Sequence, residues 1–191
     1  MWRVFNDEVS FARVSGLPRD LQPGDHAVLL YTEEHEAVEF CARFLQAGFE
    51  RGERALIALP TALRSELIGR LGPGPIETAI VLESGRLYGT DFDPEATARE
   101  LDGLIKTADG PVRVLAGPDG DSAEHIEPDT FRHYERIAHQ LVLDLRAICL
   151  CVYDGRNLPI AFSPVAIEGH PLISRGGGEV CRNADFRYQA S

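Results

Sequence analysis

Short unbroken runs of apolar residues alternate along the chain with segments whose apolar residues recur at helical spacing. The unbroken runs, typical of strands buried on both faces, lie at residues 27–31, 54–59, 76–82, 112–116 and 147–153. The helical stripes lie at residues 33–51, 61 to about 72, 94–108 and 128–145. Strands that alternate with helices predict a parallel sheet covered on both faces, because each crossover helix must bury its apolar stripe. The expected fold class is α/β, with three layers around a mostly parallel sheet.

The pattern weakens after Pro159. Ser163-Pro164 is expected to cap a short helix, and residues 172–174 and 179–181, on either side of three consecutive glycines, predict an edge hairpin. No repeat or low-complexity linker interrupts the chain. We therefore expect an N-terminal extension at residues 1–20 and a single domain at residues 21–191.

The charge balance bears on which partners fit. Among 191 residues, 19 Lys and Arg stand against 30 Asp and Glu, which gives a net charge of −11. A surface of this sign repels phosphate backbones, so direct binding to nucleic acid is not expected. Apolar residues make up 44% of the chain, which is enough to build a packed core.

The N-terminus and the cysteines indicate the compartment. The first residues lack a basic start followed by an apolar run, and no apolar run is long enough to span a bilayer. We expect a cytoplasmic protein that does not bind membranes. Four cysteines without a CxxC pair are expected to be reduced and mostly buried thiols.

The segment after the first predicted strand excludes one large class of function. A phosphate-binding α/β protein carries a glycine-rich loop with Lys-Ser/Thr at this point. Residues 31–36 of this chain, Tyr-Thr-Glu-Glu-His-Glu, contain no glycine and no lysine but three carboxylates, and the only lysine is Lys106 in a predicted helix. These charges would repel a triphosphate, so ordinary nucleoside triphosphatase activity is not expected.

Metal and hydrolytic motifs are equally weak. His35, Glu36 and Glu39 do not form the HExxH arrangement, and GxSxG does not occur. Cys149 and Cys151 share one face of a predicted strand, where core cysteines are favoured over a metal or redox pair. We expect no catalytic residue, no metal and no cofactor.

Ligands of open parallel sheets usually bind beyond the carboxyl ends of the strands. The residues expected to line such a pocket are Tyr31, His35, Tyr153, Asp154 and Arg156. His26 and His170 are weaker candidates, since they could equally bond to neighbouring backbone.

The order of several short motifs resembles the MEDS domain, the sensory domain named for methanogens, methylotrophs and the repressor DcmR. The motifs are Gly24-Asp25-His26 before Leu29-Leu30-Tyr31, then Phe49-Glu50-Arg51-Gly52-Glu53-Arg54, Phe92-Asp93-Pro94-Glu95, Tyr134-Glu135, residues 150–154 and His170-Pro171-Leu172-Ile173. The resemblance implies a RecA and KaiC-like fold that has lost its phosphate loop. It also implies a sensor of small molecules, with hydrocarbon derivatives proposed, that acts beside DNA-binding or kinase-like output modules.

Two features depart from that family pattern. Residues 117–124 replace the longer, aromatic-containing stretch expected after the fourth strand. About 25 residues precede the first strand, too few for a helix-turn-helix, so the output is expected to reside in a separate protein.

The expected function is a non-catalytic sensory or regulatory domain in bacterial signal transduction or transcriptional control. It would bind a small organic ligand and act through a transcription factor or a histidine-kinase-like protein. One alternative is a ligand-free interaction module that docks a basic partner or forms a homodimer. The other is an enzyme with a degenerate nucleotide site, in which Glu33 and Asp154 would act as acid and base.

Overall fold

The computed structural model describes residues 15–187. The strands are β1 (Ser15–Gly16), β2 (His26–Tyr31), β3 (Arg54–Leu59), β4 (Ile80–Glu83), β5 (Val112–Ala116), β6 (Ile148–Asp154), β7 (Leu172–Arg175) and β8 (Val180–Arg182). The helices are η1 (Pro18–Asp20), α1 (Glu34–Glu50), α2 (Thr61–Leu71), α3 (Pro73–Ile76), α4 (Ser84–Leu87), α5 (Pro94–Lys106), α6 (Gly120–Glu124), α7 (Pro128–Leu145) and α8 (Phe162–Glu168).

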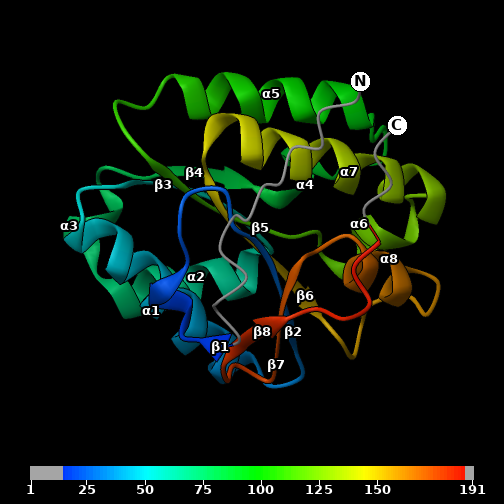
Figure 1. Ribbon diagram of the computed structural model, residues 1–191, viewed down its shortest axis with the longest axis horizontal. Helices are drawn as coiled ribbons and strands as arrows, with labels where there is room; N and C mark the ends of the chain where they lie inside the picture. The colour runs from blue at the N-terminus through cyan, green and yellow to red at the C-terminus, as the bar shows by residue number, and fades with distance from the viewer. Residues whose placement is uncertain (1–14, 188–191) are drawn as a thin grey trace, which may run out of the picture.

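The strands form one sheet in the order β1-β8-β7-β2-β6-β5-β3-β4. Strands β7, β2, β6, β5, β3 and β4 run parallel, whereas β8 pairs antiparallel with both β7 and β1. Helices α5 and α7 lie together on one face of the sheet, and α1 and α2 lie on the other (Figure 1). The expected three-layer α/β fold with a C-terminal hairpin is confirmed.

The core consists of two apolar clusters, one on each face of the sheet. Alternate residues of every central strand contribute to opposite clusters, so Val28 and Cys151 pack under α7, while Leu29 and Val152 pack under α1. Cys41, Cys149 and Cys151 are buried free thiols, as expected, but Cys181 is exposed on β8. This strict alternation decides on which side of the sheet each candidate side chain lies.

Most predicted elements agree with the structure to within a few residues, and several details differ. The strand predicted at 76–82 begins only at Ile80, because Pro73 starts the short helix α3 and the chain turns before it pairs with β3. The loop predicted after β5 contains helix α6, which the Asp119 side chain caps by accepting from the Ser122 backbone N–H. Helix α8 begins at Phe162, so Ser163 lies inside it rather than at its cap.

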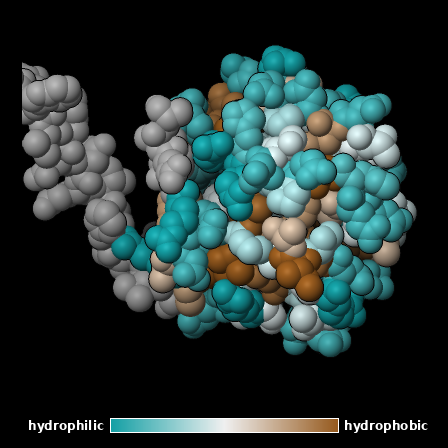
Figure 2. All heavy atoms as spheres, turned by 90° about the vertical axis from the view of Figure 1, so that its right-hand side faces the viewer, coloured by the Kyte–Doolittle hydropathy of each residue, from teal (hydrophilic) through white to brown (hydrophobic). Residues whose placement is uncertain are grey.

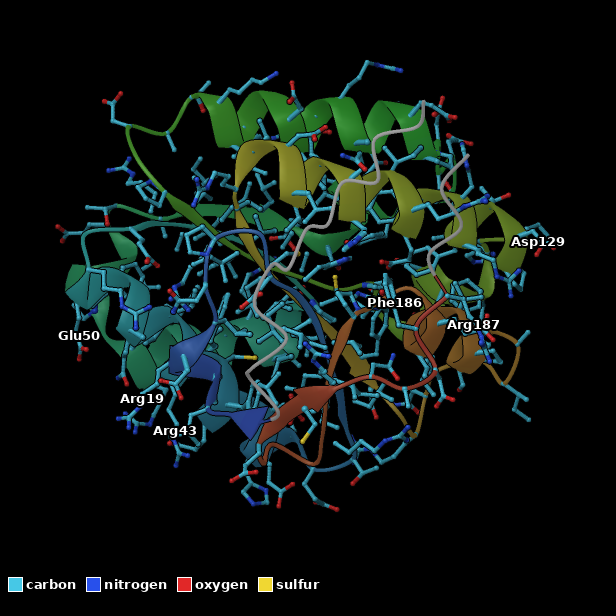
Figure 3. All side chains as sticks on the ribbon, viewed as in Figure 1. Arg19, Arg43, Glu50, Asp129, Phe186 and Arg187 are labelled. Atoms are coloured by element: carbon cyan, nitrogen blue, oxygen red, sulfur yellow. The ribbon has the colours of Figure 1, made fainter. Side chains whose placement is uncertain are left out.

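Charged side chains lie on the outside of the fold. Figure 3 shows Arg19, Arg43, Glu50 and Asp129 on the outside of the fold, and all four are exposed. Figure 2 turns the side of α6 and α8 toward the viewer and shows apolar side chains between polar ones on that face. Within residues 15–187, none of the helices is both long and apolar enough to cross a membrane.

Gly117 joins β5 to the loop at the carboxyl edge of the sheet. A Cβ atom at this position would overlap the carbonyl oxygen of Val152 on β6, which cannot move without disturbing the sheet. We expect Gly117→Ala to lower the free energy of unfolding by about 1–3 kcal/mol through overpacking. Chemical denaturation measures this change.

Gly120→Ala is the matched control, because its added Cβ would meet Asn157 only at 3.5 Å, an ordinary contact. It should leave stability nearly unchanged. Equal stability of the two variants would show that β5 and β6 do not approach as closely as described.

Candidate functional site

A cavity of about 270 Å³ lies at the carboxyl edge of the sheet, where ligands of parallel sheets usually bind. The segments that follow β2, β3, β5 and β6 all contribute to its wall. Its lining comprises Tyr31, Glu34, Pro60, Ala62, Leu63, Pro118, Asp119, Gly120, Asp154, Arg156, Asn157 and Leu158. We call it the strand-end cavity.

Asp154 organises the loop at one side of this cavity. Its carboxylate accepts hydrogen bonds from Arg156 Nε (3.1 Å) and Nη2 (3.0 Å), from the Arg156 backbone N–H (3.0 Å) and from Asn157 Nδ2 (2.9 Å). Partial burial alone would raise the pKa of Asp154, but the hydrogen bonds from Arg156 outweigh it and hold that pKa below its usual value. The carboxylate is therefore ionised and its loop is well fixed.

Tyr31 lies beside Asp154 because β2 and β6 pair in register, Tyr31 opposite Asp154. Burial, followed by the nearby Asp154 carboxylate, raises the pKa of the Tyr31 phenol. The phenol stays protonated and offers the cavity a neutral hydroxyl. Three of the expected ligand-binding residues, Tyr31, Asp154 and Arg156, thus lie together here.

The other expected residues lie elsewhere. His35 is exposed on α1 and does not line the strand-end cavity. Tyr153 and Asp154 are consecutive residues of β6, so their side chains point to opposite faces of the sheet. The Tyr153 side chain therefore enters the core beneath α7 rather than the cavity. His26 and His170 are fully buried on that same face.

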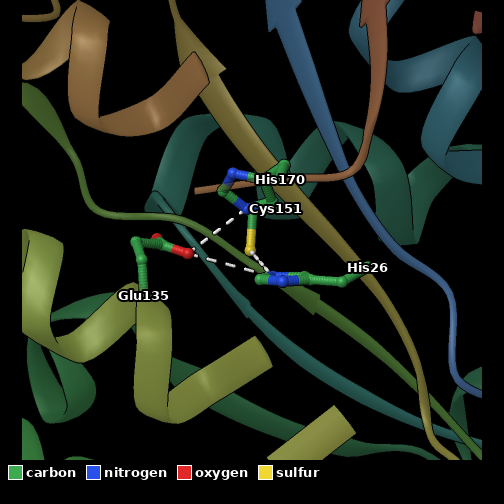
Figure 4. Close-up of side chains that lie close together, drawn as sticks. All are labelled: His26, Glu135, Cys151 and His170. Atoms are coloured by element: carbon green, nitrogen blue, oxygen red, sulfur yellow. Dashed lines mark hydrogen bonds and ion pairs between the residues drawn. The ribbon is translucent and has the colours of Figure 1, made fainter. Parts of the chain in front are cut away.

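His26, Glu135, Cys151 and His170 form a second group of side chains, which we call the buried cluster (Figure 4). The residues come from β2, α7, β6 and the turn before β7, and each offers one donor atom within 4.8 Å of the others. The Nε2 atom of His170 lies 3.3 Å from Glu135 Oε2, and that of His26 lies 3.9 Å from the same oxygen. His26 Nε2 also lies 3.4 Å from Cys151 Sγ.

Neighbouring groups orient two members of the cluster. His170 Nδ1 lies 2.7 Å from the carbonyl oxygen of Ala166, and since a carbonyl can only accept, Nδ1 carries the proton. In a neutral ring this leaves the Nε2 lone pair facing the cluster. The Tyr153 hydroxyl donates to Glu135 Oε1 at 2.7 Å, which directs Oε2 toward the two histidines. Within the described chain, Glu135 Oε2 and His170 Nε2 have no hydrogen-bond partner.

Burial sets the protonation of these groups. It lowers the pKa of His170 to about 4 and, together with the neighbouring His170, lowers that of His26 well below its usual value. Burial raises the pKa of Glu135 to about 7, although the hydrogen bond from Tyr153 acts in the opposite direction and lowers it. The contact with the Cys149 thiol, followed by burial, raises the pKa of the Cys151 thiol and keeps it protonated. At neutral pH both imidazoles are therefore neutral and can act as ligands.

Glu135 and Cys151 are the members that the sequence analysis did not select. Glu135 follows Phe131 by four residues and precedes Ala138 by three, so helical spacing places its carboxylate on the inward stripe of α7. A lone acidic residue on an apolar stripe was the available indication. Cys151 lies two residues before Tyr153 on β6, so its side chain points to the same face of the sheet. It is buried, as expected.

Three comparisons with known proteins bear on the family and the fold. The profile of the family described as MEthanogen/methylotroph, DcmR Sensory domain (MEDS) matches residues 25–171. No curated protein sequence matches the chain. The crystal structure of the flagellar accessory protein FlaH from Methanocaldococcus jannaschii superimposes with a TM-score of 0.57 at 10% identity, covering 88% of this chain and 84% of FlaH.

A crystal structure of the RadB recombinase is also similar, with a TM-score of 0.49 and 12% identity over 81% of this chain and 75% of RadB. The expected RecA-like architecture is confirmed by the likeness to FlaH. At such low identity, the likeness concerns the fold alone.

The hydrogen bond from Tyr153 to Glu135 is expected to stabilise the buried cluster. Tyr153→Phe removes the hydroxyl and leaves Glu135 Oε1 buried without that donor, which should cost about 1–3 kcal/mol of unfolding free energy. Urea denaturation at neutral pH measures the loss.

Tyr134→Phe is a matched control in the same layer, since Tyr134 is buried like Tyr153 and its hydroxyl lies 3.5 Å from that of Tyr88. This long contact should contribute much less. A loss as large for Tyr134→Phe as for Tyr153→Phe would contradict a specific role for the Glu135 hydrogen bond.

Proposed function

Because the chain belongs to the MEDS family of sensory domains, we propose that it is a non-catalytic sensor that binds a small organic molecule in the strand-end cavity. The ligand state is passed to a separate output protein. The acidic strand-end cavity is the observation that carries this proposal.

The charge of the cavity favours particular ligands. Its lining includes three carboxylates, Glu34, Asp119 and Asp154, and one guanidinium, Arg156, so its formal charge is 1 − 3 = −2. The charges of Asp154 and Arg156 already neutralise each other, because the guanidinium donates two hydrogen bonds to the carboxylate. A polyphosphate meets repulsion from the remaining carboxylates, whereas a neutral or cationic molecule with hydrogen-bond donors does not.

The arrangement suits sensing rather than turnover. The Asp154 carboxylate is engaged by Arg156 and Asn157 and serves to shape the loop. A ligand in the cavity contacts segments after four strands at once, so it selects one arrangement of these loops. The output protein, a transcription factor or a histidine-kinase-like protein of bacterial signal transduction, distinguishes that arrangement from the free one.

Thermal unfolding of the full chain tests the proposal with defined probes: magnesium ATP, ethanolamine, butylamine and 1-butanol. A ligand that binds only the folded state stabilises it, and at a concentration a hundredfold above its Kd the midpoint should rise by about 5–10 °C. We expect a rise with at least one amine or alcohol and none with magnesium ATP. Stabilisation by ATP alone, or by no probe, would contradict the proposal.

A pair of tryptophan variants locates the binding. Ala62 is exposed at the start of α2 and lines the strand-end cavity, so Ala62→Trp should fill the cavity and abolish the shift. Ser65→Trp places the same side chain one turn later at an exposed position outside the lining and should retain the shift. Loss of the shift in both variants, or in neither, would exclude this cavity as the site.

A further inference from the structure

The buried cluster is separate from the strand-end cavity, since none of its four residues lines that cavity. We propose that His26, Glu135, Cys151 and His170 bind one divalent transition-metal ion of the zinc class. This inference does not depend on the proposed ligand.

Two of the separations between donor atoms match tetrahedral coordination, and the separation between His26 Nε2 and Glu135 Oε2 is longer, at 3.9 Å. Zinc bonds of about 2.0–2.3 Å to nitrogen, oxygen and sulfur at tetrahedral angles place neighbouring donors about 3.3–3.6 Å apart. His170 Nε2 to Glu135 Oε2 is 3.3 Å, and His26 Nε2 to Cys151 Sγ is 3.4 Å. All four atoms lie within 4.8 Å of one another, so small rotations of the side chains complete the site.

The surrounding hydrogen bonds prepare the donors for an ion. Metal-bound histidines usually donate their second ring N–H to a carbonyl or carboxylate, as His170 Nδ1 does to Ala166. A coordinating carboxylate is usually held by a further donor, as Tyr153 holds Glu135. The Oε2 and Nε2 atoms that remain face each other at 3.3 Å, both fully buried and without a hydrogen-bond partner in residues 15–187.

Charge explains why a divalent ion suits this place. A cysteine thiolate and a glutamate carboxylate together carry −2, which an ion of +2 neutralises, while the two imidazoles contribute no charge. A neutral buried site avoids the cost of an isolated buried charge. On binding, the thiol proton and any proton on Glu135 leave to solvent, and the sulfur and oxygen electron pairs form the metal bonds.

The donor set also selects among metals. One thiolate and two imidazoles favour Zn²⁺, Co²⁺ or Fe²⁺ over the hard ions Mg²⁺ and Ca²⁺, which prefer oxygen. Four protein ligands close a tetrahedral shell, as in structural zinc sites, and leave no position for a substrate. The ion would join α7 to β2, β6 and the turn before β7.

A second cavity approaches the cluster but does not open onto it, since none of the four residues lines it. It measures about 700 Å³, lies on the amino side of β2 and β7, and reaches His139. The His139 ring stacks on His26 with a centroid separation of 5.6 Å. The His139 ring therefore lies between this cavity and the cluster.

Cobalt titration of the full chain, freed of metal by dialysis against a chelator, tests the proposal. One Co²⁺ per chain should produce the visible bands of tetrahedral cobalt and a thiolate-to-cobalt charge-transfer band in the near ultraviolet. Zn²⁺ should displace the cobalt and abolish the bands, and it should raise the thermal unfolding midpoint of the metal-free protein. Mg²⁺ at the same concentration should do neither.

Variants assign the ligands. Cys151→Ser should lose the charge-transfer band, and His170→Gln and Glu135→Gln should each weaken Co²⁺ binding at least tenfold, with folding checked by circular dichroism. Cys41→Ser replaces a buried thiol on the opposite face, and Cys181→Ser replaces the exposed thiol, so both should keep the wild-type spectrum.

Two results would overturn the proposal. The first is wild-type protein that binds less than one Co²⁺ per chain or gives the spectrum of an octahedral, oxygen-ligated ion. The second is an unchanged charge-transfer band in Cys151→Ser that disappears in Cys181→Ser, which would assign the ion to the surface. Neither result affects the amine and alcohol shifts that test the strand-end cavity.

Discussion

Polar groups enclosed between a sheet and its helices must find partners, because no bulk water solvates them, and this constraint governs the centre of the protein. Beneath α7, the imidazoles of His26 and His170, the Glu135 carboxyl group and the Cys151 thiol lie together in a layer made mainly of aliphatic and aromatic side chains. Tyr153 and Ala166 satisfy one atom each of Glu135 and His170. The atoms left over point inward at one another, which is the geometry of a ligand set rather than of a packed core.

Strand alternation links this cluster to the strand-end cavity. On β6, Tyr153 points under α7 and holds Glu135, whereas Asp154 points to the other face and shapes the cavity with Arg156. On β2, His26 and Tyr31 are five residues apart, an odd number, so they also lie on opposite faces of the sheet. One pair of central parallel strands thus supplies both sites, and the position of each is fixed by the same register.

The strands and helices follow from the sequence because their patterns are strong. The apolar run of β2 and the stripe of α1 specify their elements, whereas Pro73 shifts β4 toward Ile80 by starting a helix that periodicity does not predict. Tyr31, Asp154 and Arg156 were predicted to line one pocket because they lie at or just after the carboxyl ends of predicted strands. Tyr153 was wrongly placed with them because side chains alternate between the two faces of the sheet along β6. Glu135 was not predicted as a site residue because an acidic residue in a helix is usually exposed to solvent. Only packing shows that it meets His26 and His170.

X-ray absorption at the zinc edge of the zinc-loaded full chain is the most direct measurement of the buried cluster. The four-residue site predicts one sulfur at about 2.3 Å and three nitrogen or oxygen neighbours at about 2.0–2.2 Å. A first shell of oxygen and nitrogen without sulfur, or one with two or more sulfurs, would contradict it.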